Sequence, residues 1–355
     1  PGGMPPPLPV FINGRAGSGK STLLYLLFSD YVSRAAPEED AAAGRLIFLT
    51  YSEKLLAKAK DTVGRLLRNR HDFLNRRNQR SVSVTDRQLS VWFQPFARFI
   101  FGFVPDDDKK RFAPERQIDL RRFKQLFHNS SDLPQDLLSY GMKIPIPKGV
   151  TAELSWHVIR TYIKGHSVNG LLSIEDYEEV PPKDRSVSAD VFGEVFRTIW
   201  NQWYRKLVED YGFWDSQDLV RCVLDADAVR PTHAVVFCDE AQDFTRIEIN
   251  FILRLLIYRA YDLGWEQRIR LPFALAGDPF QTLNPTGFRW ESVMAAFYDE
   301  VRRELDPENR LTVAFRYEPL LFNYRSSGPV VKLGNLITLI RQRLTLRDKE
   351  VKPQQ

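Results

Sequence analysis

The stretch Val10–Leu24, VFINGRAGSGKSTLL, decides the predicted fold. An apolar, strand-like run, Val10–Asn13, leads into the pattern G-x-x-x-x-G-K-S, and a helix-like run, Lys20–Ser33, follows it. Glycines at this spacing let backbone N–H groups and the start of the helix surround phosphate oxygens. The alternative interpretation is a glycine-rich turn before an ordinary helix, which the strand and helix on either side disfavour. The stretch therefore predicts a nucleoside triphosphate site.

The predicted nucleotide contacts come from this loop and from the first turn of the helix. They are Gly14, Gly17, Ser18, Gly19, Lys20, Ser21 and Thr22. The Lys20 ammonium would reach the β- and γ-phosphates, and the Ser21 hydroxyl would bind Mg²⁺. The expected ligands of the loop are thus a nucleoside triphosphate and Mg²⁺.

Composition limits the class of protein. The chain has 355 residues, of which 43% are hydrophobic and 12% aromatic, enough to bury a substantial core. A net charge of +5 is a mild basic excess that is compatible with a polyanionic partner. The two cysteines, Cys222 and Cys238, show neither metal-ligand spacing nor a disulfide framework. Because no run approaches the length of a membrane helix, we expect an intracellular protein, cytoplasmic or nuclear, with no membrane partner.

Apolar runs alternate with helix-like segments along much of the chain. This alternation predicts an α/β fold, with a parallel sheet covered by helices on both faces. The predicted strands are Val10–Asn13, Arg45–Thr50, Leu89–Phe93, Ala234–Cys238, Leu271–Ala276 and Leu311–Phe315. The predicted helices are Lys20–Ser33, Glu53–Arg70, Gln94–Phe103, a long helix ending at Ala260, one near Glu291–Leu305 and a basic tail.

The texture changes between residues 104 and 212, where charged runs, proline-bearing loops and short amphipathic helices replace the alternation. We interpret 104–212 as an inserted, mainly helical subdomain, and 10–103 with 213–330 as one discontinuous α/β domain. The aromatic residues of the insertion are expected to be core rather than base-stacking platforms. They include Trp156, Tyr162, Trp200, Trp203 and Tyr204. Residues 1–9 are expected to be disordered, and 331–355 to form a helical tail or the start of a further lobe.

Two carboxylates, Asp239 and Glu240, directly follow the buried run Ala234–Cys238. The carboxyl ends of parallel strands form the edge where ligands of open α/β folds bind, and the glycine-rich loop belongs to the same edge. Asp239 would therefore hold Mg²⁺ beside Ser21, and Glu240 would activate the attacking water. The alternative is an acidic helix N-terminus with no catalytic role.

Taken in order, the motifs resemble the UvrD/Rep-type branch of superfamily 1 DNA helicases. Seven segments carry the resemblance: GRAGSGKS (Gly14–Ser21), LTYSEKLLAKA (Leu49–Ala59), VWFQPFA (Val91–Ala97), FWDSQDLV (Phe213–Val220), DEAQD (Asp239–Asp243), GDPFQT (Gly277–Thr282) and NYRSS (Asn323–Ser327). DEAQD matches the acidic motif of the family letter for letter and is the most specific of the seven. The resemblance implies a P-loop NTPase fold of RecA-like type, with ATP and Mg²⁺ as cofactors.

The resemblance also implies roles for residues that spacing alone leaves as ordinary polar loop positions. Gln281 would couple the nucleotide to nucleic acid, Arg325 would contact the γ-phosphate, and Tyr324 would stack near the adenine. The residues implied to line a single-strand track are Thr50, Tyr51, Phe93, Phe96, Phe288 and Arg289. The implied partner is a single-stranded nucleic acid, DNA in preference to RNA.

The sequence departs from the family pattern in several places. No glutamine precedes the first strand, Trp92 and Gln94 replace a Thr and a His, and Asn284–Gly287 lengthens the turn after Gln281. The later motifs of a second RecA-like lobe do not follow Arg325, so that lobe is expected in a longer parent protein. We therefore interpret the chain as the ATP-hydrolysing motor half of a single-strand translocase or helicase. The alternative is an ATP-binding switch or scaffold that regulates a partner without unwinding.

Overall fold

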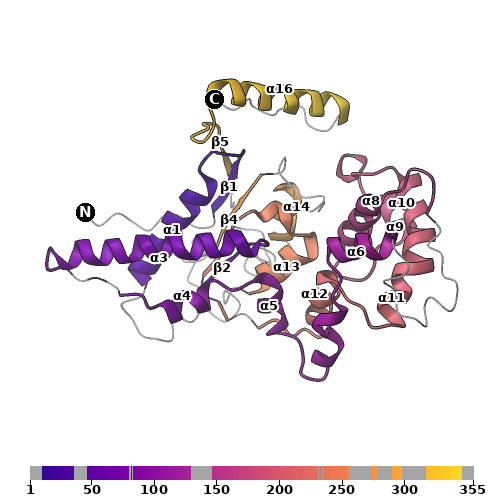
Figure 1. Ribbon diagram of the computed structural model, residues 1–355, viewed down its shortest axis with the longest axis horizontal. Helices are drawn as coiled ribbons and strands as arrows, with labels where there is room; N and C mark the ends of the chain where they lie inside the picture. Colours follow the sequence, from indigo (N-terminus) through magenta and orange to yellow (C-terminus); the bar gives the residue numbers. More distant parts are fainter. Residues whose placement is uncertain are drawn as a thin grey trace, which may run out of the picture.

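The computed structural model describes residues 10–35, 46–79, 81, 83–128, 146–230, 232–233, 235–255, 273–278, 290–297 and 317–345. Within these residues, five strands form one parallel sheet in the order β2-β3-β4-β1-β5 (Figure 1). The strands are β1 (Val10–Gly14), β2 (Leu46–Leu49), β3 (Val235–Cys238), β4 (Phe273–Gly277) and β5 (Tyr317–Leu320). Because every pair is parallel, the carboxyl ends of all five strands lie at one edge of the sheet.

Helices cover both faces of this sheet, so the α/β fold class is as predicted (Figure 1). On one face lie α1 (Lys20–Ala35), α3 (Glu53–Asn75) and α4 (Asp86–Trp92); on the other lie α5 (Phe96–Phe101), α12 (Ser216–Asp225), α13 (Arg246–Arg254) and α14 (Trp290–Phe297). Successive strand residues point to opposite faces, so that Ile47 packs with α13 and Phe48 packs with α1. Burial on both faces explains why the three strands β2, β3 and β4 are unbroken apolar runs.

The elements of the inserted segment are all helices in its described part, and they enclose a hydrophobic core of their own (Figure 1). They are 3₁₀ helices Lys109–Phe112, Pro114–Arg116 and Pro182–Asp184, α6 (Leu120–His128), α8 (Ala152–His157), α9 (Ile174–Glu179), α10 (Ala189–Val195), α11 (Arg205–Glu209), and π-helices Val158–Ile163 and Phe196–Tyr204. Trp156, Tyr162, Trp200, Trp203 and Tyr204 are all buried in this core. The prediction that these aromatic residues are core is confirmed.

The predicted strand Leu89–Phe93 is wrong, because most of this segment is the second half of helix α4. A capping box starts the helix: the Gln88 N–H donates to the Thr85 hydroxyl at 3.2 Å, and Gln88 Oε1 accepts from the Thr85 N–H at 2.9 Å. Leu89 and Trp92, three positions apart, then face the same core. A short apolar run does not distinguish a strand from a buried helical turn, and here the N-terminal cap decides.

The other predicted elements differ from the structure mainly at their ends. Helix α3 continues past Arg70, and α13 starts only after a 3₁₀ turn at Ala241–Asp243. The predicted strand Leu311–Phe315 lies outside the described residues, and the fifth strand of the sheet is β5. The basic tail forms helix α16 (Gly328–Thr345), as expected.

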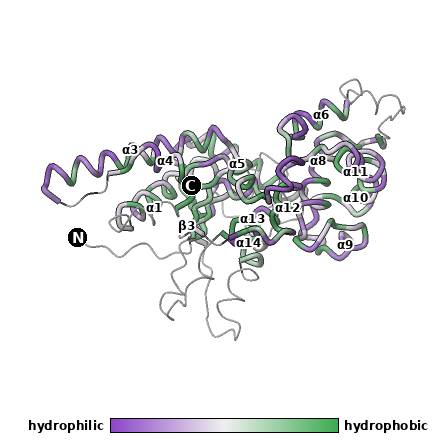
Figure 2. Tube along the Cα trace, turned by 90° about the horizontal axis from the view of Figure 1, so that it is seen from below, coloured by the Kyte–Doolittle hydropathy of each residue, from purple (hydrophilic) through white to green (hydrophobic). Residues whose placement is uncertain are grey.

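Hydrophobic residues are concentrated in the sheet, and hydrophilic residues at the outer end of α3 (Figure 2). All four residues of β3 are buried and hydrophobic, whereas the outer end of α3 is hydrophilic and carries exposed arginines such as Arg68 and Arg70. Among the helices in the described residues, none combines the length and the apolar character needed to cross a membrane.

Candidate functional site

The glycine loop, defined here as Gly14–Ser21, connects the carboxyl end of β1 to α1. Gly17 and Gly19 have φ angles of +76° and +88°, in the left-handed region that favours glycine. A Cβ atom added to Gly17 would lie 2.6 Å from Asn323 Oδ1, so the position has no room for a side chain. The loop therefore needs glycine both for its backbone turn and for its close packing.

Two polar side chains of the glycine loop have few protein partners. Lys20 is 5% exposed, and its Nζ donates a hydrogen bond to the Arg15 carbonyl at 3.3 Å. Within the described chain, no carboxylate forms an ion pair with Lys20. The Ser18 hydroxyl is buried, and no described residue hydrogen-bonds to it. Such groups are costly in a folded protein, and an anion held in the loop would satisfy both.

The structure brings this loop together with two residues that are distant in the sequence. Glu240 and Arg325 line the same small cavity, of about 60 Å³, as Ala16–Thr22. The loop follows β1, Glu240 follows β3, and Arg325 follows β5, and all three strands end at the same edge of the sheet. The predicted phosphate-binding and catalytic residues therefore meet in one place.

Asp239 lies at the end of β3, beside the first turn of α1. Asp239 is 2% exposed, and its carboxylate lies near the Ser21 hydroxyl. Burial, and then the neighbouring Glu240 carboxylate, raise the pKa of Asp239 to about 6, while the Ser21 hydroxyl and the Lys20 charge oppose the shift. A cation between Asp239 and Ser21 would offset this electrostatic cost. The pair of oxygen ligands suits Mg²⁺.

Tyr25 belongs to this site although its role was not predicted from the sequence. It lies on α1, one helical turn after Ser21, so the two side chains point to the same side. The Tyr25 hydroxyl lies near Ser21 and Asp239, and burial followed by the Asp239 charge raises its pKa. The i, i+4 spacing from a predicted metal ligand is the signal that could have identified it.

Glu240 is held in an unusual conformation by its neighbours. Its backbone is left-handed, with φ 53° and ψ 48°, which costs on the order of 1–3 kcal/mol for a residue with a Cβ atom. Glu240 Oε2 accepts a hydrogen bond from Gln242 Nε2 at 2.6 Å, and Gln242 Oε1 accepts from the Asp278 N–H at 2.9 Å. Gln242 thus connects Glu240 to the residue after β4, a role that the motif letters alone do not reveal.

Asn323 attaches the segment after β5 to the glycine loop. Its Nδ2 donates to the Ala16 carbonyl at 3.1 Å, and its Oδ1 accepts from the Arg325 N–H at 2.9 Å. The Tyr324 N–H donates to the Gly17 carbonyl at 2.8 Å. The Tyr324 side chain is 80% exposed, and that of Arg325 is exposed beside the cavity. The backbone is therefore fixed while both side chains remain open to a ligand; Asn323 itself was not predicted.

Two residues expected to line a strand track are part of the core. Phe93 and Phe96 are each 4% exposed. The Phe93 ring stacks on Phe48 with their centroids 5.0 Å apart, and the Phe96 ring meets Phe244 edge to face at 4.7 Å. Neither ring is available to stack on a base, which corrects that expectation. Aromatic residues next to a buried sheet fill its core before they serve a surface.

The other predicted strand contacts divide between buried, partly exposed and undescribed positions. Thr50 is 1% exposed, and its hydroxyl has no partner among the described residues. Tyr51 is half-buried, so part of its ring faces solvent. Phe288 and Arg289, like the predicted coupling residue Gln281, lie outside the described residues.

A buried polar network joins the inserted subdomain to the sheet domain next to Tyr51. The Arg160 guanidinium lies 5.1 Å from the centre of the Tyr51 ring, and its Nη2 lies 2.9 Å from Glu248 Oε2. The same nitrogen donates to the Asp243 carbonyl at 3.3 Å, which connects Arg160 to the acidic motif. Gln217 Nε2 also donates to Glu248, at 2.8 Å.

A second ion pair extends this network. Lys164 Nζ lies 2.6 Å from Asp215 Oδ2 and 2.5 Å from Asp218 Oδ2, and the Tyr204 hydroxyl donates to Asp215 at 2.7 Å. Both Lys164 and Asp215 are 1% exposed. None of these pairings was predicted, because each joins residues that are far apart in the sequence.

No protein-family model matches this sequence, and no curated protein matches it. The function of the chain is therefore inferred from the residues of the site and their geometry.

Proposed function

We propose that the chain is the ATP-binding and ATP-hydrolysing lobe of a motor that moves along single-stranded nucleic acid, similar to UvrD/Rep-type helicases. The observation that carries the proposal is the meeting of the glycine loop, Glu240 and Arg325 around one cavity, with Asp239 next to Ser21 beside it. For the parallel α/β sheet we propose the finer classification of a RecA-like P-loop fold.

The chemistry assigns one task to each group. Lys20 would balance the charge of the β- and γ-phosphates, while Ser21 and Asp239 would hold Mg²⁺. When bound, Mg²⁺ supplies further charge neutralisation to the phosphates. Arg325 would stabilise the charge that develops on the transferred phosphoryl group. Thr22 and Tyr324 are proposed to complete the nucleotide contacts.

Glu240 is proposed as the general base. Gln242 occupies one carboxylate oxygen, Oε2, and this bond fixes the direction of the side chain. Oε1 remains for an attacking water, from which Glu240 would take a proton. Its place in the wall of the cavity, across from the loop that would hold the phosphates, supports this role.

Strand binding is proposed to involve Tyr51, which has an accessible part and touches the buried polar network. Movement along a strand is proposed to require a second RecA-like lobe in the parent protein, because alternate gripping needs two lobes that close around ATP. The isolated chain is then expected to bind nucleotide and hydrolyse it slowly.

A second candidate is an ATP-binding switch or scaffold that regulates a partner. The burial of Phe93 and Phe96 favours it, because two of the aromatic contacts implied for a strand track are absent from the surface. Under this function the nucleotide site is retained, but nucleic acid does not change its activity.

The experiment that separates the two functions is fluorescence anisotropy of labelled single-stranded DNA and RNA, with and without a non-hydrolysable ATP analogue. The motor predicts salt-sensitive binding that changes with the nucleotide. In Lys20→Ala the nucleotide effect is expected to vanish, whereas exposed Lys58→Ala serves as the matched charge control. Strand binding that ignores the analogue, in a protein that still binds ATP, would favour the switch.

A further inference from the structure

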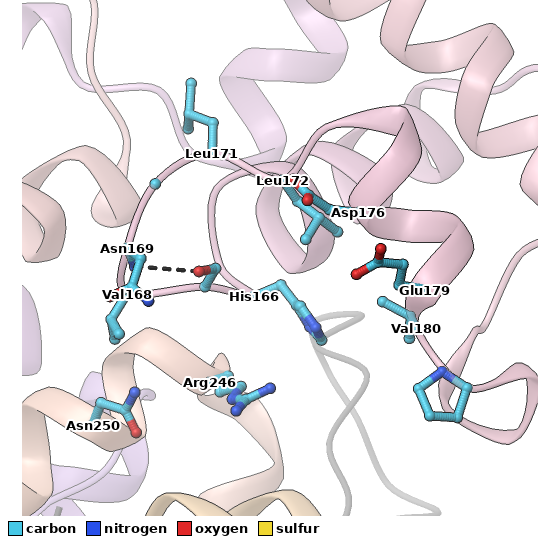
Figure 3. A pocket seen from close by; sticks show the side chains of 13 residues that line it. His166, Val168, Asn169, Leu171, Leu172, Asp176, Glu179, Val180, Arg246 and Asn250 are labelled. Carbon is cyan, nitrogen blue, oxygen red and sulfur yellow. Dashed lines mark hydrogen bonds between the residues drawn. The ribbon is translucent and has the colours of Figure 1, made fainter. Parts of the chain in front are cut away.

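A second, much larger cavity lies between the inserted subdomain and helix α13 (Figure 3). Its volume is about 650 Å³, and it is lined by the loop His166–Leu172, by α9 and its C-terminal end, and by Arg246 and Asn250 of α13. We call it the side cavity. No residue that lines it also lines the cavity at the glycine loop. The size is typical of sites for small organic ligands.

Hydrogen bonds hold both ends of the loop that forms one wall of the side cavity. Arg221 Nη2 donates to the Lys164 carbonyl at 2.7 Å and to the Ser167 carbonyl at 3.0 Å, which holds the start of the loop. The Leu172 N–H donates to the Ile163 carbonyl at 2.8 Å, which holds its end. Because both ends are fixed, the cavity has a defined shape before any ligand binds.

Helix α13 offers two polar groups on one face of the cavity. Asn250 is 6% exposed, and no described residue hydrogen-bonds to its side-chain oxygen. Arg246 lies one helical turn earlier, so the two Cβ atoms are about 6 Å apart on the same side. The Arg246 side chain is exposed into the cavity and forms no ion pair with any described residue (Figure 3). Arg246 thus supplies a permanent positive charge, and the Asn250 amide has hydrogen-bonding capacity that no described residue uses.

The opposite wall presents hydrogen-bond acceptors. Glu179 of α9 points its carboxylate toward the cavity, and Asp176 of the same helix also lines this wall (Figure 3). Asp176 Oδ2 already accepts from the Ser173 N–H at 3.0 Å, while Glu179 has no such bond within the described residues. Burial, followed by the Arg246 charge, lowers the pKa of His166 to about 4, so its ring is neutral near neutral pH.

This distribution of charge limits the ligand. Among the described lining residues Arg246 is the cationic group, and it suits one phosphate because guanidinium groups bind phosphate oxygens in pairs. The carboxylates need hydroxyl or amine donors, as the ribose hydroxyls and the exocyclic amine of a nucleoside provide. Val168 adds apolar surface for a base. The same carboxylates would repel the successive phosphates of a continuous strand.

We propose that the side cavity binds a nucleoside monophosphate, with its phosphate on Arg246 and its sugar and base facing Asn250 and Glu179. The site is separate from the glycine loop, so it gives the chain a second nucleotide-binding position. The inference does not depend on the function proposed for the glycine loop.

Isothermal titration calorimetry on the full chain tests this site with adenosine 5′-monophosphate, ribose 5-phosphate, inorganic phosphate and a single-stranded oligonucleotide. The monophosphate is expected to bind wild type and Lys20→Ala equally, since Lys20 belongs to the other cavity. Arg246→Gln is expected to weaken binding at least about tenfold, as loss of a charge-assisted phosphate contact does. Arg121→Gln, an exposed arginine of α6, is the matched control.

Two further readouts make the test decisive. Glu179→Ala should weaken adenosine 5′-monophosphate but leave inorganic phosphate unchanged, and circular dichroism confirms that both surface variants are folded. The proposal is overturned if no monophosphate binds, or if binding is lost in Lys20→Ala and kept in Arg246→Gln. It is also overturned if inorganic phosphate or the oligonucleotide binds as tightly as the monophosphate.

Discussion

Two groups of buried charges in this chain differ in how far the protein itself pairs them. In the buried polar network, Arg160 and Glu248 lie 2.9 Å apart and are 1% and 0% exposed. At the glycine loop, the Lys20 ammonium donates a hydrogen bond to a backbone carbonyl. The charge with the largest effect on the pKa of Asp239 is that of a second carboxylate, Glu240. Both regions are buried, but only the first pairs its charge with an opposite charge of the protein, even though Arg160 Nε and Nη1 have no hydrogen-bond partner among the described residues.

The difference separates a structural role from a binding role. Buried charges that find partners within the protein hold two parts of the chain in one arrangement, here the insertion and the sheet. Buried charges that lack partners reduce stability, and they are retained where a ligand supplies the missing charge. We therefore expect changes in the two regions to act on different quantities: stability for the network, ligand binding and turnover for the loop.

The largest effect is expected for Glu240→Gln at the loop. ATP hydrolysis by the chain should fall roughly 10²–10⁴-fold, because a general base is removed. ATP affinity should change little, since the amide keeps the shape of the side chain and its contact with Gln242. Single-turnover hydrolysis and calorimetric ATP binding measure the two quantities separately. Normal turnover would assign the base to another residue.

The next effect belongs to the network. Arg160→Met leaves the Glu248 carboxylate buried without a cation and should lower the free energy of unfolding by about 3–5 kcal/mol. Arg205→Met breaks an exposed pair with Glu209 and should cost no more than about 1 kcal/mol. Urea unfolding compares both with wild type. Equal losses in the two variants would mean that burial of the Arg160 pair has no special weight.

Asp239→Asn should have the opposite sign, in chelator and without nucleotide. The folded-state pKa of Asp239, about 6, lies above its ordinary value of 3.8, so the stability that it contributes is lost as the pH rises through 6. At about pH 8 the asparagine variant should be more stable by on the order of 1–3 kcal/mol, and at about pH 4, close to the ordinary pKa of an aspartate, the gap should nearly close. Urea unfolding at the two pH values measures it; a variant less stable at both would contradict the raised pKa.

The smallest effect is expected for Tyr25→Phe. Loss of the hydroxyl that lies near Asp239 and Ser21 should weaken the Mg²⁺ dependence of ATP binding by about 1 kcal/mol, or roughly fivefold. Calorimetric ATP titrations at several Mg²⁺ concentrations detect this change. An unchanged Mg²⁺ dependence would leave Tyr25 with a packing role alone.

The sequence predicts those parts of the candidate site that lie in short contiguous motifs. The glycine loop, Asp239 and Glu240 each follow an apolar run that predicts a buried strand. Their position at the same edge of the sheet could therefore be predicted. Gln242 and Asn323 form hydrogen bonds with Asp278 and Ala16, which are distant in the sequence. A local sequence pattern does not predict such pairs. The same holds for Arg160 and Glu248, which are 88 positions apart in the sequence.

The failures have physical reasons too. Leu89–Phe93 was assigned to a strand because a short apolar run fits both structures, and the Thr85 cap decided for a helix. Phe93 was assigned to a surface by its motif, but the adjoining sheet buries its ring.

The most direct test of the contrast between the two regions is a thermal-unfolding titration with Mg·ATP. If a bound nucleotide neutralises the unpaired charges of the glycine loop, saturating Mg·ATP should raise the Tm of wild type by several degrees and leave that of Lys20→Ala unchanged. Exposed Lys58→Ala should respond like wild type. No rise in wild type, or an equal rise in Lys20→Ala, would contradict the assignment of the loop as a nucleotide site.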